Sequence, residues 1–146
     1  MKGSKKMKKY INISIIYAAA AMAGGVFYRE FTKFNGFSGV TVLGKVHVHL
    51  FLLGMLVFLA VALFSAHNDL NKIKSFRCFM WVYNIGVPLT AVTMVTRGVI
   101  QVLDIPIQSA INSALSGIAG VGHILTGLGI ILLLVSLKKV AKVAEK

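Results

Sequence analysis

The sequence predicts an all-α integral membrane protein, a four-helix bundle whose helices run up, down, up and down. Of its 146 residues, 57% are hydrophobic and only 14% are charged, whereas soluble domains carry roughly 25% charged residues. The apolar residues gather into four runs, each longer than the ~20 residues that a helix needs to cross a ~30 Å hydrocarbon core. We therefore expect residues 1–146 to form a single membrane domain with short connections.

The four apolar runs give the bounds of the expected helices. The predicted spans are approximately residues 10–31, 42–66, 76–100 and 112–137. The connections between them hold residues that favour turns; they are Thr32–Thr41, Ala66–Ser75 and Leu103–Ser113. The third connection contains Pro106 and is expected to include a short interfacial helix before the fourth span. The basic segment Lys138–Lys146 is expected to continue the fourth helix out of the membrane.

The first apolar run is expected to remain in the protein as a membrane helix. Its lysine-rich start and the small residues AAAAMAGG are similar to a secretory signal peptide. The run continues through Phe27 and Tyr28, however, and is long enough to span the membrane. The single cysteine, Cys78, excludes an intrachain disulfide and is expected to be an inert packed thiol.

The distribution of basic residues predicts the orientation in the membrane. Twelve of the 16 lysines and arginines flank the first span, the second connection and the fourth span on one side: Lys2, Lys5, Lys6, Lys8, Lys9, Lys72, Lys74, Arg77, Lys138, Lys139, Lys142 and Lys146. An even number of spans places both termini together, and the positive-inside rule makes that side cytoplasmic. We therefore expect the basic residues behind the net charge of +12 to contact anionic lipid headgroups, and we do not expect nucleic-acid binding.

Ionisable side chains inside a bilayer cost about 2.5–3.5 kcal/mol each at its centre, so they are candidates for function. Six of them fall near the outer ends of the predicted spans: Arg29, Glu30, His47, His49, Arg97 and His123. Because they come from all four helices and share one end, they form a predicted cluster. For Arg29 and Glu30, mutual pairing at the interface is an equally good interpretation.

The two neighbouring histidines cannot both face the bundle axis. At about 100° per residue, His47 and His49 point about 200° apart. The His47 face carries Gly44, Gly54 and Phe58, whereas the His49 face is rich in leucine. The positions of the residues along their helices favour His49 as the partner of His123. The directions of the side chains around the helix axis favour His47. We expect His47 to be the partner, because helix tilt can absorb a depth offset but cannot absorb such a rotation.

Histidines from two helices of an apolar bundle are typical of b-type haem sites, in which imidazole nitrogens bind the iron. The predicted iron ligands are His123 and one of the pair His47 and His49. Arg97 or Arg29 would pair with the haem propionates. Gly54, Gly120 and Gly127 lie near these histidines. They indicate either close helix packing or clearance for the edge of a macrocycle.

Other interpretations of the same residues stay open. Copper or zinc would also bind imidazole, although cysteine and carboxylate ligands are scarce beside these histidines. The histidines could also do no more than bond backbone carbonyls and stabilise packing. The protein would then be a non-catalytic membrane subunit or a small transporter. The glycine-rich helix faces could mediate a homo-oligomer, and a quinone or another redox partner is a possible companion of a haem.

A family resemblance is carried by GVFYREFTKFNGF (Gly25–Phe37) and HVHLFLLG (His47–Gly54). Together they resemble a bacterial family of small four-helix membrane proteins of unknown function, which implies the bacterial plasma (inner) membrane. More distantly, H-x-H-x-x-x-x-G is similar to histidine-bearing helices of the haem–copper oxidase subunit I superfamily. That resemblance implies a single haem for electron transfer or redox and gas sensing. The chain lacks the further histidines of a binuclear copper site.

The sequence does not indicate an enzyme. It contains no serine–histidine–acid grouping, no phosphate-binding loop and no paired carboxylates that would point to a known reaction. The expected role is therefore that of a non-catalytic haem or metal protein.

Overall fold

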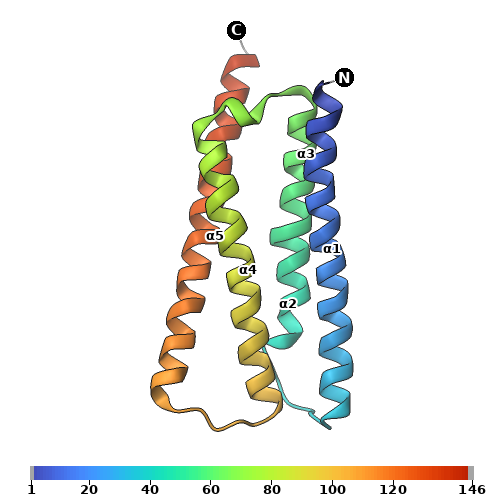
Figure 1. The fold of residues 1–146 in the computed structure, drawn as a ribbon, viewed down its shortest axis with the longest axis vertical. Helices are drawn as coiled ribbons and strands as arrows, with labels where there is room; N and C mark the ends of the chain where they lie inside the picture. The colour runs from blue at the N-terminus through green and yellow to red at the C-terminus, as the bar shows by residue number, and fades with distance from the viewer. Residues whose placement is uncertain (1, 145–146) are drawn as a thin grey trace.

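The structure, a computed structural model, describes residues 2–144 and is built from long helices that run antiparallel in turn (Figure 1). Its elements are α1 (Lys2–Phe34), α2 (Leu43–His49), the π-helical segment η1 (Leu50–Leu56), α3 (Val57–His67), the 3₁₀ turn η2 (Leu70–Lys72), α4 (Lys74–Val102) and α5 (Ser109–Ala144). Segments α2, η1 and α3 follow one another without a break and form what we term the second helix, Leu43–His67.

These helices confirm the predicted fold class. Within the described residues, four helices are long and apolar enough to cross a membrane, namely α1, the second helix, α4 and α5. Each coincides with one of the predicted spans. The basic segment after the fourth span continues α5 as far as Ala144, as expected.

The interfacial helix expected before the fourth span is not formed. The chain leaves α4 through a turn in which Asp104 has a φ of 49°, and residues 105–108 have no regular structure before α5 begins at Ser109. Pro106 explains this difference, because a proline disfavours helical geometry in the residue before it.

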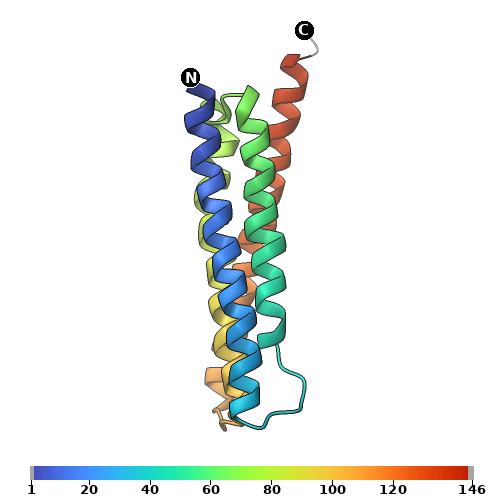
Figure 2. The ribbon, with the colours of Figure 1, turned by 90° about the vertical axis from the view of Figure 1, so that its right-hand side faces the viewer.

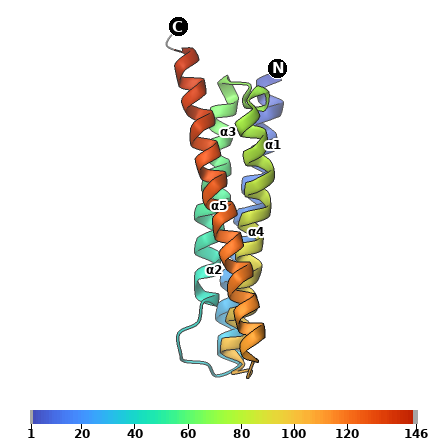
Figure 3. The same ribbon diagram turned by 90° about the vertical axis from the view of Figure 1, so that its left-hand side faces the viewer.

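The helices are arranged around α4 and the second helix. The second helix packs against α1 on one side and against α4 on another, and α5 packs along α4. Figure 2 shows α1 beside the second helix, and Figure 3 shows α5 in front of α4. Both chain termini lie at one end of the molecule (Figure 1), which we term the terminal end. The connections at residues 35–42 and 103–108 lie at the opposite end.

An aromatic cluster joins three of the helices. Tyr17 of α1 stacks on Phe58 of the second helix with ring centroids 5.6 Å apart, and Phe58 lies 6.1 Å from Tyr83 of α4. Phe79 completes the contact between Phe58 and Tyr83. Aromatic pairs at such separations contribute about 0.5–1.5 kcal/mol beyond the burial of their area.

Polar contacts at the terminal end tie α1 to the turn before α4. Lys6 forms an ion pair with Asp69 at 2.6 Å, and Tyr10 donates a hydrogen bond to Asn71. The hydrogen bond from Lys6 lowers the pKa of the Asp69 carboxyl.

The π-helical segment is held by side chains from the neighbouring helices. The Tyr83 hydroxyl donates to the Leu53 carbonyl at 2.7 Å, and the Ser14 hydroxyl donates to the Met55 carbonyl at 2.9 Å. Because a π-turn departs from the regular hydrogen bonding of an α-helix, these external donors stabilise it. Gly54 lies at its centre, directly beneath the ring of Tyr17.

Replacing Gly54 with alanine is expected to destabilise the protein by about 1–3 kcal/mol, the usual range for overpacking a core. A Cβ atom at this position would lie 2.2 Å from Cδ1 of Tyr17. Chemical denaturation of the purified protein in detergent would measure the change. Gly127→Ala is the matched control, since a Cβ there meets nothing within 4 Å. Equal stability of the two variants would contradict this packing.

Candidate functional site

A pocket of about 340 Å³ lies between the second helix, α4 and α5, and its lining residues come from the parts of these helices nearer the connections at residues 35–42 and 103–108. Its lining combines apolar residues with two histidines and two cationic side chains: Val42, Lys45, His49, Thr93, Met94, Arg97, Ala119 and His123. The volume is within the roughly 300–1,000 Å³ range of small-molecule sites. The structure therefore brings together His49, Arg97 and His123, which lie on three different helices.

The two histidines of the pocket share the same local geometry. Nδ1 of His49 lies 2.9 Å from the Lys45 carbonyl, and Nδ1 of His123 lies 2.8 Å from the Ala119 carbonyl. In both cases the partner is the residue four positions earlier, one helical turn away. Because a carbonyl oxygen only accepts, Nδ1 carries the proton in each ring. The lone pair of a neutral ring then lies on Nε2, which has no hydrogen-bond partner among the described residues.

This arrangement is the one that metal-binding histidines use. A histidine that binds a metal through one nitrogen almost always donates its other N–H to a carbonyl, a carboxylate or water, which fixes the orientation of the ring. In His49 and His123 the backbone of the same helix provides that acceptor. Both side chains could therefore bind a metal through Nε2.

The charged residues of the pocket are cationic. Lys45 and Arg97 line it, and none of the described residues that line it is acidic. Nη2 of Arg97 donates to the Ser116 hydroxyl at 2.7 Å, and that hydroxyl donates to the Asn112 carbonyl at 2.9 Å. Arg97 also borders an adjoining hollow of about 230 Å³. The guanidinium is therefore held beside α5 at the mouth of a pocket that favours an anionic ligand.

His47 lies on the other side of the second helix, so the expectation that it faces His123 is wrong. A Cβ built on Gly25 of α1 would lie 3.7 Å from Cβ of His47, and Nδ1 of His47 is buried without a hydrogen-bond partner among the described residues. The predicted interior face of the second helix packs against α1. The pocket is instead on the face that carries His49.

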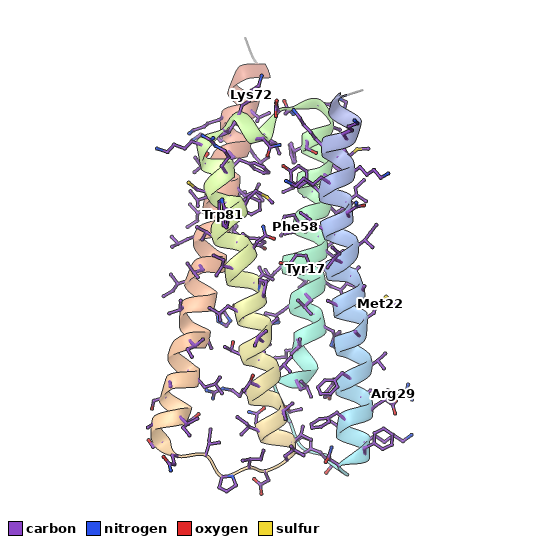
Figure 4. All side chains as sticks on the ribbon, in the orientation of Figure 1. Tyr17, Met22, Arg29, Phe58, Lys72 and Trp81 are labelled. Atoms are coloured by element: carbon purple, nitrogen blue, oxygen red, sulfur yellow. The ribbon has the colours of Figure 1, made fainter. Side chains whose placement is uncertain are left out.

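Of the remaining predicted site residues, two lie away from the pocket and two lie near His123. Arg29 is 81% exposed, lies 3.8 Å from Glu30 and points away from the bundle (Figure 4), so it is remote from the pocket. Gly54 is covered by Tyr17 and gives no clearance. Gly120 and Gly127, by contrast, lie on α5 near His123, where a Cβ atom would meet nothing within 4 Å.

Lys45 is a charged residue of this site that was not predicted from the sequence. It lies four positions before His49, so its carbonyl orients the imidazole and its side chain reaches the same pocket. The i, i+4 spacing of a lysine and a histidine was the available signal. It becomes informative only once His49 is known to face α4 and α5.

Comparison with known proteins identifies a family for this chain. No curated protein and no solved structure matches the chain, and a likeness to the haem–copper oxidases is not among the similarities found. The family model for proteins of unknown function, DUF2871, matches residues 7–140, which is nearly the whole chain, and confirms that the family is one of unknown function. The chain therefore belongs to the DUF2871 family.

Proposed function

We propose that the protein binds one b-type haem in the pocket between the second helix, α4 and α5, where His49 and His123 would hold the iron. The observation that carries this proposal is the pair of histidines on separate helices, each fixed through Nδ1, that share one pocket with two cations. Bound haem would supply one-electron chemistry. We assign the protein to electron transfer or to redox or gas sensing.

The chemistry of the pocket suits both parts of a haem. Its apolar lining, from Val42, Met94 and Ala119, suits the macrocycle. Lys45 and Arg97 suit the two propionates, since pairs between cationic side chains and carboxylates are among the stronger hydrogen bonds in proteins. The open space at Gly120 and Gly127 leaves room for a planar group to extend beyond the pocket along α5.

A bare copper or zinc ion suits the pocket less well. Two imidazoles are good ligands for either ion, but the cationic Lys45 and Arg97 repel a dication. Within the described residues no group of three His, Cys, Asp or Glu side chains is placed to hold a metal ion. Haem differs from a bare ion in bringing its own equatorial nitrogens and its own negative charge, so two histidines and two cations are sufficient.

The same proposal includes an orientation in the plasma membrane. The terminal end carries most of the lysines and arginines, which favours the cytoplasmic side for both termini. The haem would then lie in the half of the membrane that is further from the cytoplasm.

The proposal is tested by titrating the purified, haem-free protein with haem in detergent. We expect a Soret band that saturates at one haem per chain and shifts on reduction with dithionite. The variant His67→Ala is the control, because His67 ends the second helix at the terminal end, and this variant should bind haem normally. If the amount of haem bound in the presence of the protein never exceeds the amount taken up by protein-free micelles, haem binding is refuted.

Replacing Arg97 with leucine is expected to weaken haem binding by about 10- to 150-fold, which corresponds to the roughly 1.5–3 kcal/mol of a hydrogen bond to a charged group. The iron ligands remain, so the position of the Soret band should not change. Arg29→Leu is the matched control, since Arg29 is exposed and remote from the pocket. If both variants bind haem as tightly as the parent protein, Arg97 does not pair with a propionate.

A further inference from the structure

A second cavity lies on the opposite side of α4 from the histidine pocket. It is a groove of about 490 Å³ between α1 and α4, with Leu50 of the second helix as its floor. Its lining is almost entirely apolar: Ile13, Ile16, Tyr17, Ala20, Leu50, Asn84, Pro88, Ala91 and Val92. The groove lies within the spans of α1 and α4, so its occupant would come from the bilayer.

One hydrogen-bond donor that lines this groove has no partner among the described residues. Tyr17 is only 9% exposed, and it extends from α1 towards the middle of the bundle (Figure 4). Among the described residues nothing forms a hydrogen bond with its hydroxyl, in contrast to Tyr83, which donates to the Leu53 carbonyl. An unpaired hydroxyl in an apolar site costs free energy, so the groove favours a ligand that brings an acceptor.

A free acceptor lies across the groove on α4. Pro88 has no N–H, so the backbone carbonyl of Asn84, four residues earlier, lacks its usual helical donor. The Asn84 side chain donates its own amide to the Met80 carbonyl at 2.6 Å, which leaves its amide oxygen free. The groove thus presents a phenol donor on α1 and amide acceptors on α4, with apolar walls between them.

We propose that this groove binds the ring of a membrane quinone. A quinone carbonyl can accept from Tyr17, and the hydroxyl of the reduced form can donate to the oxygens of Asn84. A lipid acyl chain would fill the apolar volume but satisfy neither group. The choice of a quinone over other apolar ring compounds rests on the proposed haem function, because a quinone is the bilayer-soluble carrier that a membrane haem would need.

The test compares two ligands of nearly the same shape on the haem-free protein. Menadione carries two carbonyls on a methylnaphthalene ring, and 2-methylnaphthalene carries none. Equilibrium dialysis against empty detergent micelles measures the binding that depends on protein. We expect menadione to bind saturably, and Tyr17→Phe to weaken it by about 2- to 10-fold, the effect of one hydrogen bond. Binding of 2-methylnaphthalene should be weaker and unchanged by Tyr17→Phe.

A second pair of variants addresses the groove itself. Ala20→Phe places a ring in the groove and should abolish menadione binding, whereas Ala19→Phe, on an exposed position outside the groove, should not. The proposal would be overturned by equal affinity for the two ligands. It would also be overturned if neither Tyr17→Phe nor Ala20→Phe changed menadione binding. Because haem is absent from these assays, their failure is separate from a failure of the haem titration.

Discussion

Replacing His123 with alanine is expected to abolish stoichiometric haem binding while the protein still folds. His123 is exposed on α5, so its removal leaves no cavity in the core, and its only hydrogen bond among the described residues is to the Ala119 carbonyl of its own helix. The loss would therefore be that of an iron ligand. Haem content per purified chain, measured after expression with added haem, checks this result, with circular dichroism as the control for folding.

The two histidines of the second helix supply a matched pair for the same assay. His49→Ala should lose the second axial ligand and most of the bound haem. His47→Ala should keep haem content within about twofold, because His47 packs against α1 near Gly25 and does not reach the pocket. The reverse outcome, in which His47→Ala loses haem and His49→Ala keeps it, would show that the second helix binds haem through its other face.

Replacing Gly86 with leucine is expected to cost about 3 kcal/mol or more, at the upper end of overpacking, and to separate α5 from α4. A Cβ at Gly86 would lie 2.6 Å from the backbone nitrogen of Thr126, and backbone cannot move aside as a side chain can. On the facing helix, Gly122 makes an equally close approach to Thr90. These glycines let the two helices pack closely, as small residues do in membrane bundles.

The stability lost in Gly86→Leu is measured after purification, from the fraction of protein that is monodisperse and from its resistance to denaturant. Gly120→Leu is the control, because a side chain at that position of α5 has open space. If Gly86→Leu is as stable as Gly120→Leu, then α4 and α5 do not pack through these glycines. Since Arg97 and His123 lie on these two helices, Gly86→Leu should also lose haem.

Most of the fold could be predicted from the sequence because a membrane imposes a simple length requirement. Four apolar runs of sufficient length could form only membrane helices, and short connections made sequential neighbours antiparallel. The interfacial helix before α5 was predicted wrongly, since the restriction that Pro106 places on its neighbour outweighed the helical pattern. The π-helical segment at Leu50–Leu56 was not predictable, because it depends on donors from Ser14 and Tyr83 on other helices.

The candidate site was predicted in part. The sequence indicated that Arg97, His123 and one of two histidines belong together, and the structure gathers such a set. Which of the two histidines faces α4 and α5 was not predicted, because the interior faces of the helices do not all point to one axis. In the structure the small-residue face of the second helix packs on α1, through Gly44 against Tyr28 and Gly54 against Tyr17. Only tertiary packing determines which helix meets which face.

The coordination of the iron tests the central proposal most directly. Electron paramagnetic resonance of the oxidised, haem-loaded protein distinguishes a low-spin iron with two histidine ligands from a high-spin iron with one. We predict a low-spin signal in the parent protein and in His47→Ala, and conversion of any residual haem to high spin in His49→Ala and His123→Ala. A parent protein whose haem is high-spin, or a low-spin signal that survives in both His49→Ala and His123→Ala, would contradict ligation by these two histidines.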